Sequence, residues 1–252
     1  MNETTLTKMN QMKLYGMHQF FYDLLQTVGV KKLTIDEALS MMVQAEWEDR
    51  ENRKITRSLR NAKFRYNALM EQVDFTHQRG LDKNQFMRFV DCAYISKKEN
   101  ILIAGPTGVG KSYLASALGN QACMKALKVL YVNTHKLFTK LKIAKADGTY
   151  LKEIDKIERL DLLILDDFGL QPIDNQSRMS LMDIIEDRHG RKSTIVSSQL
   201  PLEKWYEVIG ESTVADAIID RLFNASHKII LSGESMRKNN KFESNRDRKS
   251  VV

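Results

Sequence analysis

Eight residues near the middle of the chain have the composition of a phosphate-binding loop. The stretch Gly-Pro-Thr-Gly-Val-Gly-Lys-Ser at 105–112 fits the pattern G-x-x-x-x-G-K-[ST]. Backbone N–H groups of such a loop wrap the phosphates of a nucleotide such as ATP, and glycines permit the tight path. Lys111 is expected to reach the β- and γ-phosphates, and Ser112 to give its hydroxyl to Mg2+. The predicted nucleotide contacts are Gly105, Pro106, Thr107, Gly108, Val109, Gly110, Lys111, Ser112 and Tyr113.

Two adjacent aspartates, Asp166 and Asp167, follow the apolar run 162–165. With the next two residues they read D-F-G, a motif of protein kinases, but the sequence contains neither H-R-D-x-x-x-x-N nor V-A-I-K. The pair therefore predicts a Walker B motif, in which Asp166 is the second magnesium anchor. We expect Asp167 to polarise a water for attack on the γ-phosphate, unless it is only a cap or loop residue. Phe168 and Gly169 are interpreted as the turn that leaves the strand.

Polar residues at the ends of two later stretches are candidates to complete the site. Ser197, Ser198 and Gln199 end an apolar run, and the carboxyl end of a parallel strand faces the ligand crevice. We expect Gln199, or otherwise Ser198, to hydrogen-bond the γ-phosphate or the attacking water; ordinary strand-end polarity is the alternative. Arg221 lies in the helix-like stretch 216–223, where a lone arginine is usually a surface residue.

The pattern that must position these residues is an alternation of strands and helices from residue 100 onward. Continuous apolar strands that alternate with helices predict an α/β fold with a parallel sheet covered on both faces. The predicted strands are 101–105, 129–133, 161–167 and 193–199, and the predicted helices are 111–126, two short ones in 135–159, and 175–190.

The first 72 residues or so have the periodicity of helices throughout, with a break at Gly29. Thr34 and Glu37 have the spacing of a capping box. The sequence therefore predicts a small all-helical N-terminal domain at 1–74, an ATPase domain at 75–238 and a basic, disordered tail at 239–252. The helix after Thr34 carries a row of basic residues without acidic partners beyond residue 53, which is either a solvated face or a nucleic-acid surface. Its candidate DNA contacts are Arg53, Arg57 and Arg60.

The composition restricts the class of protein. The chain has 252 residues, a formal net charge of +7 and a pI near 9.2, and a basic excess favours a polyanionic partner such as DNA. There is neither a signal peptide nor an apolar run of the roughly 20 residues that span a bilayer, so we expect a cytoplasmic protein without a membrane partner. Cys92 and Cys123 do not have the spacing of a zinc site.

Three stretches together resemble the IstB helper ATPases of insertion-sequence transposition. They are GPTGVGKSYLASALGNQAC, DLLILDDFGLQP and the stretch that runs from STIVSSQLP to GESMRK. The resemblance implies the initiator branch of AAA+ ATPases, close to the DnaC helicase loaders. It also implies a homo-oligomer with ATP at subunit boundaries, which binds and remodels double-stranded DNA and recruits a partner transposase.

The same resemblance implies roles for further residues. Gln199 or Ser198 would be the sensor, Arg221 a finger given in trans to a neighbouring subunit, and Arg237 a late phosphate-sensing arginine. The two-helix insertion at 135–159 lies where initiator-branch proteins contact DNA, and its basic side is a candidate for phosphate contacts or else a solvated face. The candidate residues there are Lys136, Lys140, Lys142 and Lys145.

Two departures from the wider AAA+ pattern affect the expected activity. Most members carry Asp-Glu where this chain has Asp166-Asp167, and the shorter side chain suggests slow hydrolysis. We also expect no helical C-terminal lid domain. Three alternatives remain: a DnaC-like replicative helicase loader, a scaffold that uses ATP only as an assembly ligand, and a small-molecule P-loop kinase, which the positive charge disfavours.

Overall fold

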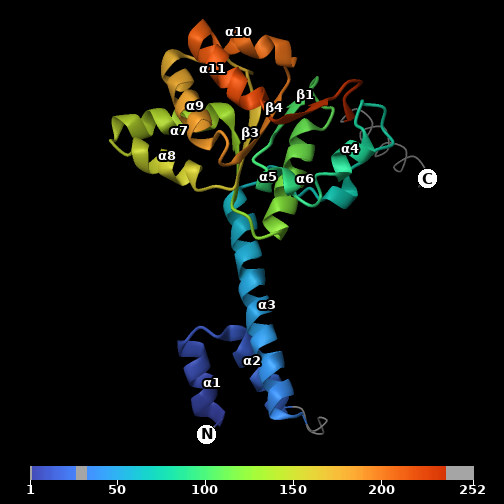
Figure 1. Cartoon of the computed structure of the whole chain (residues 1–252), viewed down its shortest axis with the longest axis vertical. Coiled ribbons are helices and arrows are strands. Elements are labelled where there is room, and N and C mark those ends of the chain that lie inside the picture. The colour runs from blue at the N-terminus through green and yellow to red at the C-terminus, as the bar shows by residue number, and fades with distance from the viewer. Residues whose placement is uncertain (1, 27–32, 237–252) are drawn as a thin grey trace, which may run out of the picture. The chain divides into compact units, whose positions relative to one another are not determined.

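A computed structural model describes residues 2–26 and 33–236 of the chain (Figure 1). The predictions for Gly29, Arg237 and the tail at 239–252 therefore lie outside the described residues. The chain divides into two compact units, Met1–Arg57 and Ser58–Val252, and each is described by itself.

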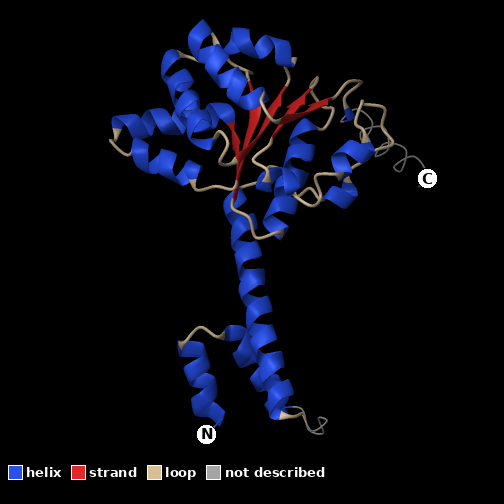
Figure 2. Cartoon of the chain, in the orientation of Figure 1, coloured by secondary structure: helices blue, strands red, loops and turns tan. Residues whose placement is uncertain are grey.

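A parallel sheet forms the centre of the second unit, as the sequence predicts, but it has five strands where four were predicted (Figure 2). Its strand order is β2-β3-β4-β1-β5, so β4 lies between the strand that leads into the phosphate loop and the strand that ends in the aspartates. The strands are β1 (Asn100–Ala104), β2 (Val129–Asn133), β3 (Leu162–Phe168), β4 (Ser193–Ser198) and β5 (Ser226–Ile230).

Side chains alternate between the two faces of this sheet, and each face has its own apolar core. Ile101 and Ile103 of β1 belong to the core shared with helix α6 (Lys111–Met124). Leu102 and Ala104 belong to the core on the other face, which a group of five helices covers (Figure 2). These helices are α7 (Thr134–Ala146), α8 (Tyr150–Glu158), α9 (Asn175–Arg188), α10 (Trp205–Ile209) and α11 (Ser212–Phe223).

The end of β3 differs from the sequence interpretation of Phe-Gly as a turn. Phe168 is the last residue of the strand and is only 1% exposed. Its ring centroid lies 4.8 Å from that of Trp205, so burial of the aromatic pair holds the strand in the sheet for one residue more than predicted. The turn begins at Gly169, which has φ 75°.

The first unit contains α1 (Asn2–Gln11), α2 (Tyr15–Gln26) and most of the long helix α3 (Ile35–Ala62). The predicted capping box is confirmed: the Thr34 amide donates to Glu37 Oε2 at 2.8 Å, and the Glu37 amide donates to Thr34 Oγ1 at 3.3 Å. The buried Glu46 carboxylate accepts the Gly16 amide at 2.9 Å and so caps the start of α2.

Residues 58–74 pack in the core of the second unit, whereas the sequence groups them with the helical domain. Helix α3 ends at Ala62 because Lys63 takes a left-handed φ of 58°, so the prediction of continuous helix to about residue 72 is wrong. The following segment contains one 3-10 turn, Met70–Gln72, and leads to α4 (Lys83–Met87) and α5 (Ala93–Ser96). The buried apolar residues of 58–74 are Ala62, Ala68, Met70 and Val73.

Candidate nucleotide site

The phosphate loop connects β1 to α6 and has no room for side chains at two of its glycines. Gly108 has φ 87° and Gly110 has φ 95°. A Cβ atom at Gly108 would lie 2.0 Å from Ser235 Oγ, and one at Gly110 would lie 2.3 Å from Nη1 of Arg79. Glycine is therefore required twice over, by the backbone conformation and by the close approach of these two neighbours.

Lys111 and Ser112 form the first turn of α6, directly after this loop. The Lys111 ammonium donates to the Pro106 carbonyl at 2.7 Å, so its side chain folds back over the loop. The Ser112 hydroxyl donates to Asp166 Oδ1 at 3.0 Å. The hydroxyl and the carboxylate that the sequence predicts as magnesium ligands are therefore direct neighbours.

Asp166 is 1% exposed, and three hydroxyl groups from three different elements surround its carboxylate. Ser112, Tyr131 of β2 and Ser197 of β4 each donate a hydrogen bond to it. Burial, together with the hydrogen bond to Asp166, raises the pKa of Tyr131 above its usual range, so this hydroxyl remains a donor. A buried carboxylate needs such partners, because an unpaired charge away from water is costly.

Asp167 has a different set of partners, since its backbone takes φ 57° where the pairing of β3 with β4 shifts in register. Its Oδ2 accepts a hydrogen bond from Asn133 Nδ2 at 3.1 Å and lies 3.6 Å from Nη1 of Arg65. A left-handed conformation in a non-glycine residue costs energy, and the surrounding contacts must stabilise it. The carboxylate lines an open pocket.

This pocket has a volume of about 460 Å³ and lies beyond the carboxyl ends of the strands. Ligands of open α/β sheets bind at this edge. Phosphate-loop and aspartate residues line one part of the pocket, and residues of the segment after α3 line another. The lining residues that carry the argument are Arg65, Tyr66, Arg79, Lys111, Ser112 and Asp167.

Gln199 and Ser198 occupy different environments, although they are adjacent in sequence. Gln199 lines the pocket, and its Oε1 accepts a hydrogen bond from the Thr107 hydroxyl at 2.6 Å. Ser198 is fully buried, where its hydroxyl donates to the Phe168 carbonyl at 2.7 Å and accepts the Leu200 amide at 3.1 Å. The geometry thus favours Gln199 as the group that meets a ligand, and Ser198 as a tie between β3 and β4.

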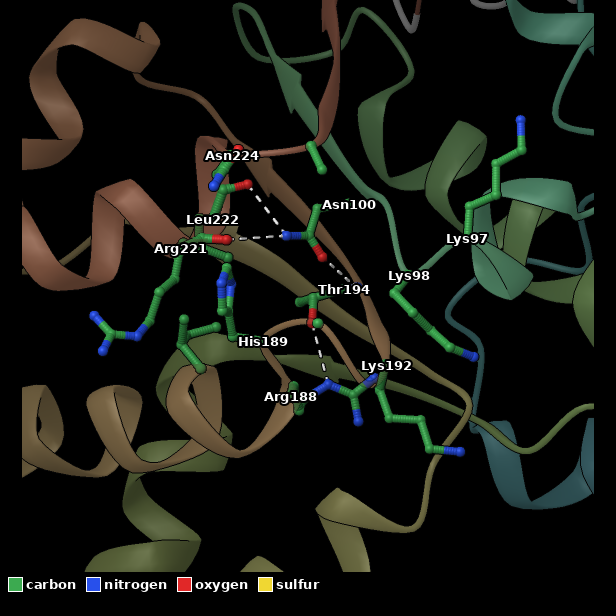
Figure 3. Close-up of a pocket in the computed structure, with 13 residues that line it drawn as sticks. Lys97, Lys98, Asn100, Arg188, His189, Lys192, Thr194, Arg221, Leu222 and Asn224 are labelled. Carbon is green, nitrogen blue, oxygen red and sulfur yellow. Dashed lines mark hydrogen bonds between the residues drawn. The ribbon is translucent and has the colours of Figure 1, made fainter.

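Arg221 lies far from these residues, beside a second pocket at the opposite edge of the sheet (Figure 3). This pocket, of about 260 Å³, is lined by Asn100 at the start of β1 and by Thr194 near the start of β4. Arg221 forms an ion pair with Glu186 at 2.5 Å and donates to the Ala217 carbonyl at 3.0 Å. Figure 3 shows its guanidinium pointing away from Asn100, and Arg221 is not among the residues that line the nucleotide pocket of its own chain.

The four candidate lysines of the insertion differ in their partners. Lys140 forms an ion pair with Glu153 of α8, and Lys142 forms one with Asp174. The Lys145 ammonium lies 4.4 Å from the centre of the Tyr150 ring. Lys136 is exposed, and its backbone amide is bound by the Asn133 side chain that caps α7.

The candidate arginines of α3 also differ in whether they have acidic partners. Arg53 pairs with Asp49 at 2.6 Å, and its guanidinium lies 4.9 Å from the centre of the Tyr15 ring. Arg50, on the same helix, forms an ion pair with Glu46 at 2.7 Å. Arg57 and Arg60 are exposed.

Several residues of the site have no sequence signal. Tyr131 and Asn133 reach the aspartates because β2 flanks β3, and the strand order is not readable from the motifs. Arg79, only 2% exposed, donates to the carbonyls of Val109 and Asp74 at 2.8 and 2.7 Å. Burial lowers the pKa of Arg79. Its hydrogen bond to Val109 braces the phosphate loop.

No helix within the described ranges, 2–26 and 33–236, is long and apolar enough to cross a membrane.

Comparisons with known proteins agree with this geometry. The family model for IstB-like ATP binding proteins matches residues 7–244. An insertion sequence ATP-binding protein of Sinorhizobium fredii is 45% identical, over 95% of this chain and 98% of its own length. The insertion sequence IS21 ATP-binding protein of Pseudomonas aeruginosa is 30% identical, over 91% of this chain and 86% of its own.

Solved structures share the fold of the second unit. The DnaI structure matches with a TM-score of 0.56 and 22% identity, over 66% of this chain and 91% of that one. The DnaC helicase loader matches with a TM-score of 0.55 and 19% identity, over 66% of this chain and 97% of that one. The predicted α/β fold with a parallel sheet, after a helical N-terminal region, is confirmed.

Proposed function

Because the chain belongs to the IstB-like ATP-binding protein family, we propose that this AAA+ ATPase assembles on double-stranded DNA in insertion-sequence transposition. In this proposal it remodels the target DNA and recruits a partner transposase. The observation that carries the proposal is a phosphate loop whose Ser112 is bonded to Asp166 and whose pocket Asp167 also lines, in a chain that is 45% identical to an insertion sequence ATP-binding protein.

In this role the phosphate loop would bind the ATP phosphates, with Lys111 on the β- and γ-phosphates. Ser112 and Asp166 would hold Mg2+, which prefers hard oxygen ligands and usually keeps several waters. Their fit is supported by the 3.0 Å distance between Ser112 Oγ and Asp166 Oδ1, which places two such ligands side by side. Bound there, the ion would neutralise charge on the phosphates.

Asp167 is the proposed general base, and Gln199 is the proposed sensor of the γ-phosphate or the attacking water. The pocket location of both side chains supports these assignments. Asp167 shares one carboxylate oxygen between Asn133 and Arg65, and it is one carbon shorter than the glutamate found in most AAA+ proteins. Both features favour slow turnover, in which ATP acts as a timer.

Arg221 is proposed to act on the ATP of a neighbouring subunit. The nucleotide pocket lies at one edge of the sheet and Arg221 at the other, so a head-to-tail arrangement of subunits would bring the two together. An arginine supplied in this way neutralises charge that develops in the transition state. ATP would therefore lie at each subunit boundary of a homo-oligomer.

DNA binding is proposed for the exposed basic residues Lys136, Arg57 and Arg60. Lys140 and Lys142 are weaker candidates, because each already has an acidic partner. Contacts of this kind bind phosphates without reading sequence, so affinity should fall steeply as the salt concentration rises.

The deciding experiment measures ATP turnover by the full chain with and without duplex DNA, together with its mass in solution with and without ATP. The proposal predicts DNA-stimulated turnover and ATP-dependent growth in mass. Turnover that ignores DNA, from a particle whose mass stays that of a monomer, would refute it.

The Asp167→Asn variant should keep ATP and DNA binding and lose turnover by about 100-fold, the usual size of a general-base effect. A helicase loader would instead bind a replicative helicase.

A further inference from the structure

Arg65 brings a positive charge to the nucleotide pocket from outside both phosphate-site motifs. It lies in the non-helical segment that follows α3, and it lines the same pocket as Lys111 and Asp167. Its Nη1 is 3.6 Å from Asp167 Oδ2, and its side chain keeps 51% of its surface exposed. The guanidinium is therefore paired with the proposed base and still open to a ligand.

Two aromatic neighbours fix the backbone on either side of Arg65. The Phe64 ring packs so closely on α6 that a Cβ at Gly119 would lie 2.5 Å from it, and its centroid is 6.3 Å from that of Tyr131. The Tyr66 ring lies 6.2 Å from that of Tyr113, in the first turn of α6. Because both anchors are on elements of the site itself, the segment presents Arg65 to the pocket in a defined position.

The surroundings of Arg65 keep it charged. Tyr66, followed by Tyr131 and the two aspartates, raises the pKa of Arg65 above its usual value, although partial burial acts in the opposite direction. The guanidinium also lies 5.5 Å from the centre of the Tyr66 ring, within range of a cation–π contact. An always-charged planar fork of this kind matches the oxygens of a phosphate as well as those of a carboxylate.

We propose that Arg65 reads whether the nucleotide carries a γ-phosphate, and so makes the pocket prefer ATP over ADP. Without a γ-phosphate the guanidinium stays on Asp167. With ATP bound it moves to the γ-phosphate oxygens, and Asp167 is released to act on water. This inference rests on the proposed function, since it needs ATP in this pocket, but it adds a residue that neither phosphate-site motif contains.

The position of Arg65 in the chain connects this exchange of partners to the end of the long helix α3. Lys63 and Phe64 alone separate it from Ala62, the last residue of α3. A change of partner at Arg65 therefore acts on the backbone segment that leaves this helix. ATP and ADP would be distinguished at the point where the chain passes from the long helix to the ATPase core.

The test compares the affinities of the full-length chain for a non-hydrolysable ATP analogue and for ADP, by titration calorimetry with Mg2+ present. Arg65→Ala should weaken analogue binding about tenfold, the effect of losing a charged hydrogen bond, and change ADP binding less than about twofold. Arg65→Lys should recover part of the loss, because it keeps the charge without the fork. Arg88→Ala, an exposed arginine at the end of α4, is the matched control and should bind both nucleotides like the parent chain.

The ratio of the affinity for the ATP analogue to the affinity for ADP tests the proposal. If Arg65→Ala retains the parent ratio, or loses affinity equally for both nucleotides, Arg65 only shapes the pocket and the proposal is wrong. Arg65→Gln is a second variant, should circular dichroism show that the alanine variant is unfolded. These titrations need neither DNA nor turnover. A parent chain that binds ATP but ignores DNA would therefore refute the proposed function while leaving this inference measurable.

Discussion

The two edges of the central sheet carry pockets of opposite character. At the carboxyl edge polar groups converge, and three hydroxyls from three elements meet on the carboxylate of Asp166. At the amino edge the basic side chains diverge: Figure 3 shows Lys97, Lys192 and Arg221 pointing in different directions.

Arg188 accounts for much of this difference between the two pockets, because it stabilises the fold at the amino edge. Its guanidinium donates to the carbonyls of Ile157, Leu160 and Ser193 and to the hydroxyl of Thr194, and burial lowers its pKa to about 10. Four of its five N–H donors are thus used within the protein. In the proposed function the carboxyl edge binds ATP within one chain, whereas Arg221 at the amino edge acts on the ATP of another subunit.

The largest expected effect is on the carboxyl edge. Lys111→Ala should weaken ATP binding by roughly 1,000-fold, about 4 kcal/mol, because the buried phosphates lose their charged partner. Titration with a fluorescent ATP analogue measures this. Retention of affinity within tenfold would mean that the pocket does not bind phosphates through its loop.

A large effect of another kind is expected at the amino edge. Arg188→Met should lower the free energy of unfolding by about 3 kcal/mol, because the carbonyls of Ile157, Leu160 and Ser193 all lose a charged donor. Urea denaturation measures it, with Lys192→Met as the control. Lys192 pairs with Asp161 at 2.7 Å near the surface, so its loss should cost under about 1 kcal/mol. Equal losses in the two variants would contradict the structural role of Arg188.

Arg221→Ala tests whether the amino edge serves a second subunit. DNA-stimulated turnover should fall about 100-fold, roughly 2.7 kcal/mol, while ATP affinity changes less than about twofold. Mixing this variant with Lys111→Ala should restore part of the activity, because an intact pocket on one subunit can meet an intact arginine on another. Mixtures no more active than their components would place Arg221 outside the reaction.

The smallest expected effects separate two neighbours on the carboxyl edge. Gln199→Ala should lower turnover about tenfold with the stability unchanged, since its side chain faces the pocket. Ser198→Ala should instead lower the free energy of unfolding by about 1 kcal/mol through the lost tie to Phe168. The reverse pattern, measured by turnover and by thermal denaturation, would make Ser198 the sensor.

The sequence predicts the elements that carry strong local patterns. Four of the five strands are apolar runs, and the phosphate loop has a fixed spacing, so both could be predicted. The fifth strand, β5, begins Ser-His-Lys and has no apolar run to mark it. Its place beside β1 is set by pairing with residues more than a hundred positions earlier in the chain.

The partners of the site could not be predicted for a related reason. Arg65 and Arg79 precede the ATPase motifs and reach the pocket only because residues 58–79 fold onto α6 and the loop. Lys63, with its left-handed backbone, ends the helix without a proline or glycine to signal it. Such contacts depend on where distant segments cross, which no local pattern specifies.

The bracing of the phosphate loop has a consequence for the synthesis of the chain. The segment 231–236 closes over the loop: the Ser232 amide donates to the Arg79 carbonyl at 2.9 Å, and the Met236 amide donates to the Gly108 carbonyl at 3.1 Å. A ribosome makes the loop long before it makes this cover. The nascent protein should therefore bind ATP only late, after nearly all of the described fold has been synthesised. Chains released early would be unable to join an ATP-dependent assembly.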